Sequence, residues 1–358
     1  MNKLLKNINP EDLKKLMVDH GFQAYRVDQI FSYIYKKRIR DFQEMLLLPR
    51  EIRDFLDKEF ELEVFQSNTI RRSEDGSVKF LFKLRDNLSI ESVYIPADNE
   101  SDDDNSRKTL CVSTMAGCPV NCSFCATATL GYKRNLDTAE IIEQVLKSEE
   151  ILNLKFSNIV FMGMGEPFLN IENVNSAINI LSNQTYDLIN SKKITLSTIG
   201  IPDRIIKYAD SPNPVKIAVS LHATTNGQRA MIIPLAKSHS LTKLFDSLEY
   251  FYQKTHLPIT YEYIVFDDFN NTELDAKRLA KFCSRFPSKV NLIPFNDISF
   301  TNPKPKEVEL KAASKEKIEE FAALLRQYGA KVFIRDTFGK DIEAACGQLA
   351  LSSEKLLK

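Results

Sequence analysis

The sequence predicts an α/β fold: a partial barrel of six βα units, with a small helical and antiparallel domain before it and a functional loop after it. Two observations carry this prediction. After residue 105, apolar strand-like stretches alternate six times with amphipathic helical ones. Before residue 95, two helical stretches are followed by residues with a hydrophobic period of 2. Six such units imply a parallel sheet with helices outside it, and they are too few to close an eight-stranded barrel.

The chain begins with two predicted helices. Asn9 and Pro10 are typical of a helix start, and Gly21 is typical of a helix end. A second helix is indicated by apolar side chains at helical spacing, namely Val27, Ile30, Phe31 and Ile34.

The second helix ends in the basic run 36–40, Lys-Lys-Arg-Ile-Arg. One interpretation is a solvated helix end whose charges favour the helix dipole. The other is a patch that contacts RNA phosphates. The sequence leaves both open.

An antiparallel unit follows from about residue 62. Apolar and polar residues alternate over 78–84, after a turn at Asp75-Gly76, and a second turn at Asp86-Asn87 leads into a strand over 89–95. We therefore expect an accessory domain over 1–95 and a catalytic domain over 105–350.

The barrel elements can be placed by length and period. Predicted strands lie near 109–114, 157–162, 192–198, 215–221, 259–266 and 288–295, with a short one at 331–335. Predicted helices include 138–152, 241–253, 272–286 and 314–328. Chemistry in such sheets gathers at the C-terminal strand ends.

Composition limits the possible functions. The chain of 358 residues carries 48 basic and 48 acidic side chains, so any nucleic-acid surface must be a local basic patch. No apolar stretch is long enough to span a bilayer, and the N-terminus is unlike a secretory signal, so we expect a cytoplasmic protein. In a reducing compartment its six cysteines are expected to be metal ligands or catalytic thiols.

Three cysteines form the most informative motif. Cys118, Cys122 and Cys125 have the spacing CxxxCxxC, directly after the first barrel strand. Three thiolates can hold three irons of a [4Fe–4S] cluster and leave the fourth iron open, where S-adenosylmethionine (SAM) could chelate. The alternative is a zinc knuckle completed by a distant histidine.

A second motif, Phe-Met-Gly-Met-Gly-Glu-Pro over 161–167, ends the next strand. Glycines there let a ligand approach the backbone, and Glu166 can accept from an ammonium group. In isolation the motif is more typical of a simple tight turn.

Together with further motifs, the two resemble a known family. The motifs are Glu91-Ser-Val-Tyr-Ile-Pro96, Cys111-Val-Ser, Gly131-Tyr-Lys-Arg-Asn135, Leu196-Ser-Thr198, Ser220-Leu-His222, Asn291-Leu-Ile-Pro-Phe-Asn296 and Ala344-Ala-Cys346-Gly-Gln348. The set resembles the radical SAM enzymes of the RlmN family, dual-specificity methyltransferases that act on carbon 2 of adenine in RNA. The resemblance covers essentially the whole chain.

The resemblance implies a role for each matching residue. It implies that Cys118, Cys122 and Cys125 ligate a [4Fe–4S] cluster. It implies a catalytic set of Glu91 as proton acceptor, Cys346 as methyl carrier and Cys111 as the partner in a transient disulfide. It also implies that SAM is bound by Gly165, Glu166, Ser197, Ser220, Leu221, His222 and Asn296.

The chemistry explains why such a site is needed. Carbon 2 of adenine lies between two ring nitrogens and is not a nucleophile, whereas a carbon radical can add to it. By resemblance, one SAM methylates Cys346, a second generates the radical, Glu91 removes the carbon-2 proton and Cys111 frees the product. The base must also leave the RNA stack. Lys133 and Arg134, next to the cysteine loop, are candidates for holding the RNA.

Each catalytic residue also has an ordinary interpretation. Glu91 alone would be a surface charge on an edge strand, and Cys111 a small buried hydrophobe. Cys346 has no periodic partner and is expected on a loop. His222 could be a core histidine, although its place at a strand end favours the site.

The resemblance implies the substrates and partners. These are adenine 2503 of 23S rRNA, adenine 37 of some tRNAs, and an electron donor such as a flavodoxin or ferredoxin, with the enzyme itself a monomer. One rival is a carbon-8 adenine methyltransferase of the Cfr type, which confers antibiotic resistance and shares nearly every motif. The other is a non-catalytic zinc-containing RNA-binding module.

Overall fold

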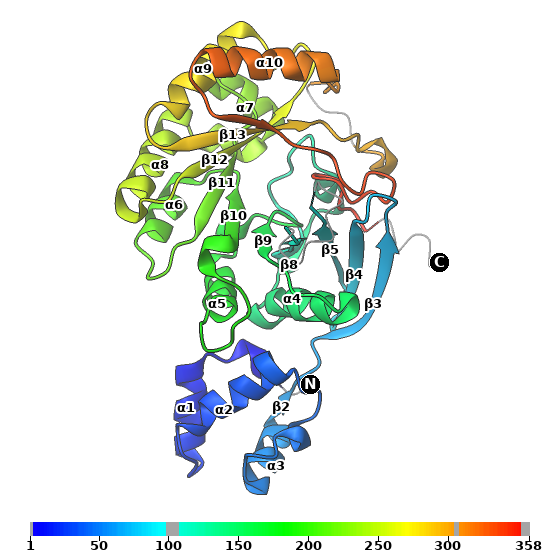
Figure 1. Ribbon diagram of the computed structural model, residues 1–358, viewed down its shortest axis with the longest axis vertical. Coiled ribbons are helices and arrows are strands. Elements are labelled where there is room, and N and C mark those ends of the chain that lie inside the picture. Colours follow the sequence, from blue (N-terminus) through cyan, green and yellow to red (C-terminus); the bar gives the residue numbers. More distant parts are fainter. Residues whose placement is uncertain (1–2, 98–106, 304–307, 352–358) are drawn as a thin grey trace.

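The N-terminal part of the molecule is a separate layer of helices below the main sheet (Figure 1). The computed structural model describes residues 3–97, 107–303 and 308–351. Both predicted helices are present, and Asn9 caps the first by accepting from the Asp12 N–H at 2.9 Å. The elements of this part are β1 (Lys3–Leu4), η1 (Leu5–Asn7), α1 (Pro10–Asp19), α2 (Arg26–Ser32), η2 (Tyr33–Lys37), η3 (Phe42–Glu44), α3 (Arg50–Glu59) and β2 (Phe60–Glu61).

One helix of this layer was missed from the sequence. The stretch 50–59 forms α3, with Ile52 and Leu56 buried one turn apart. Pro49, directly before the helix, and this spacing of two apolar residues are the signals that could have revealed it.

The core of the molecule is a single sheet that runs, among the described residues, through ten strands in the order β14-β13-β12-β11-β10-β9-β6-β5-β4-β3. The neighbours from β6 to β14 are parallel, and those from β3 to β6 are antiparallel. The strands are β3 (Phe65–Arg72), β4 (Val78–Leu84), β5 (Ser89–Ile95), β6 (Thr109–Cys111), β9 (Asn158–Phe161), β10 (Ile194–Thr198), β11 (Lys216–Ser220), β12 (Ile259–Val265), β13 (Ser288–Pro294) and β14 (Val332–Ile334).

Helices cover the outer face of the parallel strands (Figure 1). Apolar side chains from helices and strands form one large buried core. The helices are α4 (Thr138–Leu152), α5 (Ile171–Leu181), α6 (Pro202–Ala209), α7 (Asn226–Ile232), α8 (Leu241–Thr255), α9 (Glu273–Cys283) and α10 (Lys315–Gln327). The predicted partial barrel is therefore confirmed.

The sheet runs without a break from the strands of the predicted accessory domain to those of the predicted barrel. Val93 of β5 lies opposite Cys111 of β6 in antiparallel register. The antiparallel strands expected in the accessory domain are thus hydrogen-bonded to the barrel, and β5 is an inner strand.

The first barrel strand is shorter than the predicted 109–114. After β6, the Ser113 N–H donates to the side chain of Gln144 on α4 at 2.8 Å, and the Gln144 amide donates back to the Ser113 carbonyl at 2.9 Å. A side chain thus replaces the neighbouring strand here. The chain then forms the small β7 (Met115–Gly117) and β8 (Tyr132–Asn135) pair.

The C-terminal segment, which we define as residues 335–351, follows β14 without helix or strand, as expected for the region of Cys346. It runs back beside β4 and β5 (the red segment in Figure 1). The Asp75 carboxylate accepts from the Gly339 N–H at 2.6 Å, and Ser73 donates to Asp341 at 2.5 Å. The two ends of the sheet are thereby connected.

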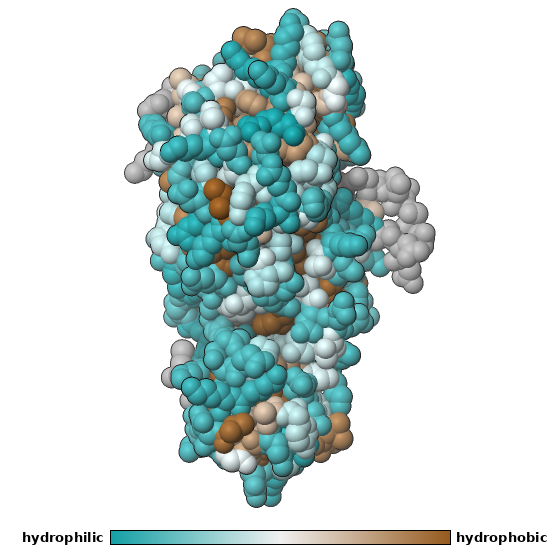
Figure 2. All heavy atoms as spheres, turned by 90° about the vertical axis from the view of Figure 1, so that its left-hand side faces the viewer, coloured by the Kyte–Doolittle hydropathy of each residue, from teal (hydrophilic) through white to brown (hydrophobic). Residues whose placement is uncertain are grey.

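The face shown in Figure 2 is mostly hydrophilic, with small separate apolar patches. Extended apolar patches are typical of membrane or obligate protein interfaces, and this face shows none over the described residues. Nor does any described helix have the length and apolarity needed to cross a membrane.

Candidate functional site

A cavity of about 540 Å³ lies at the C-terminal ends of the parallel strands. Its size is typical of a small-molecule site. With two exceptions, Glu91 and Leu221, it is lined by all the site residues expected from the sequence: Cys111, Cys118, Cys122, Cys125, Gly165, Glu166, Ser197, Ser220, His222, Asn296 and Cys346. The fold therefore brings together residues from five strand ends, the cysteine loop and the C-terminal segment.

The cysteine loop is held in place by its own backbone. The Cys118 N–H donates to the Gly131 carbonyl at 3.2 Å, and the Ser123 N–H donates to the Ile232 carbonyl, at the end of α7, at 2.8 Å. Burial first, and then the thiols of Cys125 and Cys118, raise the pKa of Cys122. The three thiols thus lie near one another in a preformed loop.

The donor set fits a cluster better than a zinc ion. Zinc gathers four ligands, its cysteine sulfurs about 2.3 Å away, whereas a cubane cluster spreads its cysteines over different irons. Among the described residues, no three His, Cys, Asp or Glu side chains meet closely enough to hold a single metal ion. The three thiols face one cavity, and three thiolates are the ligand number expected for a cluster with one open iron.

A buried arginine beside the loop was missed from the sequence. Arg229 is 1% exposed; its Nε donates to the Leu221 carbonyl at 3.2 Å, and its Nη2 donates to the carbonyls of Ser220 and Ile199. Its Nη1 is buried and has no hydrogen-bond partner. A cluster held by three thiolates carries negative charge, so this free guanidinium edge suits the group that the loop would hold. Helix α7, which carries Arg229, was not predicted.

Glu166 is oriented by three donors within the protein. Its carboxylate accepts from the Thr198 hydroxyl at 2.7 Å, the Ile199 N–H at 2.8 Å and the Phe168 N–H at 3.0 Å. A carboxylate has about four acceptor sites, so one is left for a ligand in the cavity. Burial raises the pKa of Glu166 to about 7.

The preceding Gly165 has a φ of 109°. A Cβ at this position would lie 2.7 Å from the Cβ of Met115. The site therefore requires glycine here for both backbone conformation and space.

His222 is buried and lines the cavity. Its Nδ1 accepts from the Ile264 N–H at 3.0 Å, which leaves the proton on Nε2. Its ring packs edge-on against Phe124 of the cysteine loop, with the centroids 4.6 Å apart. Burial lowers the pKa of His222 to about 3, so the ring is a neutral donor at physiological pH.

Leu221 and Asn296, both expected to bind SAM, are placed differently in the structure. Leu221 is fully buried and its side chain does not line the cavity. Asn296 lines the cavity and its amide donates to the Cys346 carbonyl at 3.1 Å. In this structure Asn296 therefore helps to fix the C-terminal segment.

Cys111 and Cys346 face the same cavity although they are far apart in sequence. Burial raises the pKa of Cys111, and the nearby Cys346 raises it further. Cys346 is exposed to the cavity, while burial of its sulfur among the cavity walls still raises its pKa. Accessibility decides whether a reagent can reach it, so Cys346 is the reachable thiol and Cys111 the sheltered one.

Glu91 is not the edge-strand surface charge that was one interpretation of the sequence. It is fully buried on the inner strand β5, and its Oε1 lies 3.2 Å from the ammonium of Lys79. Its Oε2 accepts from the Leu351 N–H at 3.1 Å. Burial raises the pKa of Glu91, whereas Lys79 lowers it. The C-terminal segment thus separates Glu91 from the cavity.

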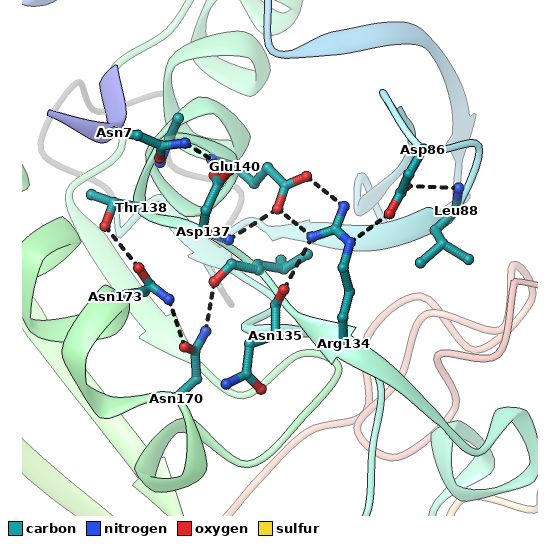
Figure 3. Close-up of polar contacts among 12 residues, drawn as sticks. Asn7, Asp86, Leu88, Arg134, Asn135, Asp137, Thr138, Glu140, Asn170 and Asn173 are labelled. Atoms are coloured by element: carbon teal, nitrogen blue, oxygen red, sulfur yellow. Dashed lines mark hydrogen bonds and ion pairs between the residues drawn. The ribbon is translucent and has the colours of Figure 1, made fainter. Parts of the chain in front are cut away.

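Arg134, expected to contact RNA, is engaged within the protein (Figure 3). Its guanidinium donates twice to Glu140 at 2.8 Å and once to Asp86 at 2.5 Å. In the same network Asn7 donates to Asp137 at 2.7 Å, which joins the N-terminal layer to α4. Lys133, which is exposed, is the better placed of the two for a phosphate.

The basic run 36–40 likewise contains arginines that are paired within the protein and lysines that are exposed. Arg38 pairs with Glu149 of α4, and Arg40 pairs with Glu150. Lys36 and Lys37 are exposed, so the two interpretations of the run apply to these lysines.

Comparisons with known proteins identify the family of the chain. Residues 112–280 match the model of the radical SAM superfamily, and residues 3–62 match the model of a ribosomal RNA large subunit methyltransferase N-terminal domain. The chain is 39% identical to a probable dual-specificity RNA methyltransferase RlmN of Christiangramia forsetii, over 98% of this chain and 97% of the relative. It is 38% identical to the protein of the same description from Thermotoga sp., over 99% of each chain.

A solved structure shows the same fold. The crystal structure of a radical SAM methyltransferase from Sphaerobacter thermophilus has a TM-score of 0.86 and 33% identity, over 97% of this chain and 99% of that one. This likeness confirms the radical SAM partial barrel predicted from the sequence.

Proposed function

The chain belongs to the RlmN family of dual-specificity RNA methyltransferases, which are radical SAM enzymes, and on this basis we propose that it methylates carbon 2 of adenine. The proposed targets are adenine 2503 of 23S rRNA and adenine 37 of some tRNAs. The observation that carries the proposal is that Cys111, Cys346 and the three-cysteine loop face one cavity. A non-catalytic zinc module has no use for the two additional thiols.

The family implies a [4Fe–4S] cluster and SAM. We propose that Cys118, Cys122 and Cys125 hold the cluster, with the guanidinium of Arg229 beside it. When bound, the cluster supplies the electron that cleaves SAM. Glu166 and the polar groups at the ends of β10, β11 and β13 are proposed to orient SAM.

Cys346 is the proposed methyl carrier because it is the thiol that the cavity exposes. Its sulfur takes a methyl group from one SAM, and a second SAM is consumed in activating that methyl group. The activated carbon forms a bond to carbon 2 of the adenine, and the RNA is then covalently attached to Cys346.

Glu91 and Cys111 complete the proposed sequence. Glu91 accepts the proton of carbon 2, and the one unpaired electron left on the adduct passes to the oxidised flavodoxin or ferredoxin, which leaves a closed-shell thioether. The Cys111 thiolate then attacks the Cys346 sulfur, so that an S–S bond forms and the S–C bond breaks. The electron pair of that bond stays on the product carbon, which takes up a proton to become the methyl group. An external thiol reductant resets the disulfide.

The burial of Cys111 and Glu91 fits the order of these proposed steps. The buried Cys111 has a raised pKa, so it remains a protonated, unreactive thiol until the site opens. Glu91 is shielded by the C-terminal segment that carries Cys346, so a movement of this segment exposes the base. Cytoplasmic location, a monomeric state and a flavodoxin or ferredoxin as electron donor are part of the same proposal.

Nucleoside analysis tests the activity. The protein is reconstituted anaerobically, incubated with SAM, reductant and unmodified rRNA or tRNA, and the RNA is digested and analysed by mass spectrometry. We expect 2-methyladenosine. If only 8-methyladenosine formed, the Cfr-type rival would replace this proposal; if neither formed in protein with a full cluster content, the proposed reaction would be wrong.

A further inference from the structure

A buried ion pair lies under the C-terminal segment. In β4 and β5, Lys79 is opposite Val93 and Leu81 is opposite Glu91, so Lys79 and Glu91 share one face of the sheet. Val93 is in turn opposite Cys111, and both line the cavity. The ion pair is therefore on the catalytic face of the sheet, beside Cys111.

The pair holds the C-terminal segment on both sides of Cys346. The Lys79 ammonium donates to the Glu343 carbonyl at 3.2 Å, three residues before Cys346. The Glu91 carboxylate accepts from the Leu351 N–H at 3.1 Å, five residues after it. Because the side chains of Lys79 and Glu91 are 1% and 0% exposed, water cannot replace either contact.

We propose that Lys79 is a positioning residue: it keeps the proton acceptor Glu91 ionised and, together with Glu91, clamps the segment that carries Cys346. The inference rests on the proposed function, because it takes Glu91 as the base. Lys79 does not touch the substrate in this role; it acts through Glu91 and the segment.

Charge coupling gives the clamp a release step. As long as Glu91 is ionised, it attracts both the Lys79 ammonium and the Leu351 N–H. Once Glu91 has accepted the carbon-2 proton, its charge is lost and both attractions weaken. Once the segment has moved to expose Glu91, proton transfer would thereby keep it from closing again while Cys111 reaches the Cys346 sulfur.

The acidic groups nearby favour a protonated Lys79 beside an ionised Glu91. Burial lowers the pKa of Lys79, whereas Glu91 and Glu343 raise it and Arg71 lowers it. Arg71 itself lies 3.8 Å from Glu343. Cys111 is the further titratable group on this face, and its pKa is raised. Without Lys79, burial would raise the pKa of Glu91 further, and the base would ionise only at higher pH.

The first test measures the clamp without turnover. Iodoacetamide is added to cluster-loaded Lys79→Met protein without SAM or RNA, and alkylation of the sheltered Cys111 is followed by peptide mass spectrometry. A lost hydrogen bond to a charged group implies alkylation about tenfold faster than in wild type. Lys83→Met, a lysine replacement on the same strand, is the control and should match wild type. A wild-type rate in Lys79→Met would overturn the clamp.

The second test measures the base. In Lys79→Met the covalent RNA adduct should decay about tenfold more slowly at neutral pH than in wild type, because loss of the ion pair with Lys79 raises the pKa of Glu91 and destabilises its ionised form. The decay should recover as the pH is raised. A merely structural defect would slow decay at every pH alike, and that result would overturn the positioning role.

A double variant covers the case in which Lys79→Met does not fold. Removing one partner of a buried pair leaves an uncompensated charge, whereas removing both does not. Lys79→Met/Glu91→Gln should therefore unfold at a higher temperature than Lys79→Met and still show fast alkylation of Cys111. Slow, wild-type alkylation in the double variant would contradict the clamp.

Glu91→Gln alone separates this inference from the proposed function. If Glu91→Gln turned over normally, Glu91 would not be the base and the proposed mechanism would fail. If Glu91→Gln accumulated adduct while Lys79→Met matched wild type in alkylation and pH dependence, only the role of Lys79 would fail.

Discussion

At the scale of single residues, the site depends on burial that controls protonation. Cys111 and Glu91 are sheltered, and burial raises the pKa of both. His222 is held neutral by burial and by the nearby Arg229, which lower its pKa to about 3. Under the proposed mechanism, these groups stay sheltered until a ligand or a movement of the chain exposes them.

The low pKa of His222 predicts how stability depends on pH. The unfolded chain binds a proton on this histidine below about pH 6.5, whereas the folded chain binds it only near pH 3. Between these values the unfolded state binds more protons, so this contribution to stability is complete above pH 6.5 and is lost on acidification. The loss approaches about 1.4 kcal/mol per pH unit.

Urea unfolding at pH 8 and pH 5 measures this effect. His222→Asn is the comparison, because asparagine tolerates the positive φ of 54° and can accept from the Ile264 N–H. The stability of wild type should fall more steeply on acidification than that of the variant. Parallel pH curves for the two proteins would show that His222 titrates normally and is not held neutral.

At the scale of elements, α4 joins the N-terminal layer to the barrel. Its glutamates pair with basic residues of that layer: Glu143 with Lys6 at 2.5 Å, Glu149 with Arg38 and Glu150 with Arg40. Its N-cap Asp137 contacts Asn7, and its Gln144 holds the chain after β6 (Figure 3 shows the N-terminal end of this helix). The helix therefore connects the N-terminal layer to the strand that leads to the cysteine loop.

Arg38→Gln should lower the stability of the protein, whereas Lys36→Gln should not. Arg38 neutralises Glu149, whose side chain is 3% exposed, so its loss should destabilise the protein by about 1–3 kcal/mol. Lys36 is exposed, so its replacement should leave stability unchanged and, if this lysine contacts phosphate, weaken RNA binding and reduce its salt dependence. Denaturant unfolding and RNA titrations at two salt concentrations check both variants.

Equal stability of the two variants would contradict the structural role of Arg38. Unchanged RNA affinity in Lys36→Gln would remove that lysine from the RNA surface.

At the scale of the whole molecule, the sequence predicted the barrel well because its strands and helices are local patterns. The helix over 138–152 and the strands over 78–84 and 89–95 occur with the predicted bounds. The continuity of β5 with β6 could not be predicted, since strand pairing depends on contacts between distant residues. The small β7–β8 pair was missed for the same reason.

For the site too, local patterns could be predicted from the sequence and contacts between distant residues could not. The three-cysteine loop is a local pattern, and its residues do share the cavity. Arg229 was missed because a single arginine in a sequence carries no sign of burial. Arg134 and Arg38 were taken as RNA candidates because their acidic partners lie on other elements. Lys79 has a partner twelve residues away on a neighbouring strand, and only the register shows that the two side chains share a face.

The central claim is that Cys346 carries the methyl group and Cys111 releases the product. The most direct measurement compares Cys111→Ala with Cys346→Ala after anaerobic incubation with SAM, reductant and RNA, and follows covalently bound RNA on a denaturing gel. Cys111→Ala should form the adduct and fail to release it, because no second thiol can attack the Cys346 sulfur. Cys346→Ala should form no adduct at all. If Cys111→Ala released methylated RNA at the wild-type rate and retained none, the paired-cysteine mechanism would be contradicted.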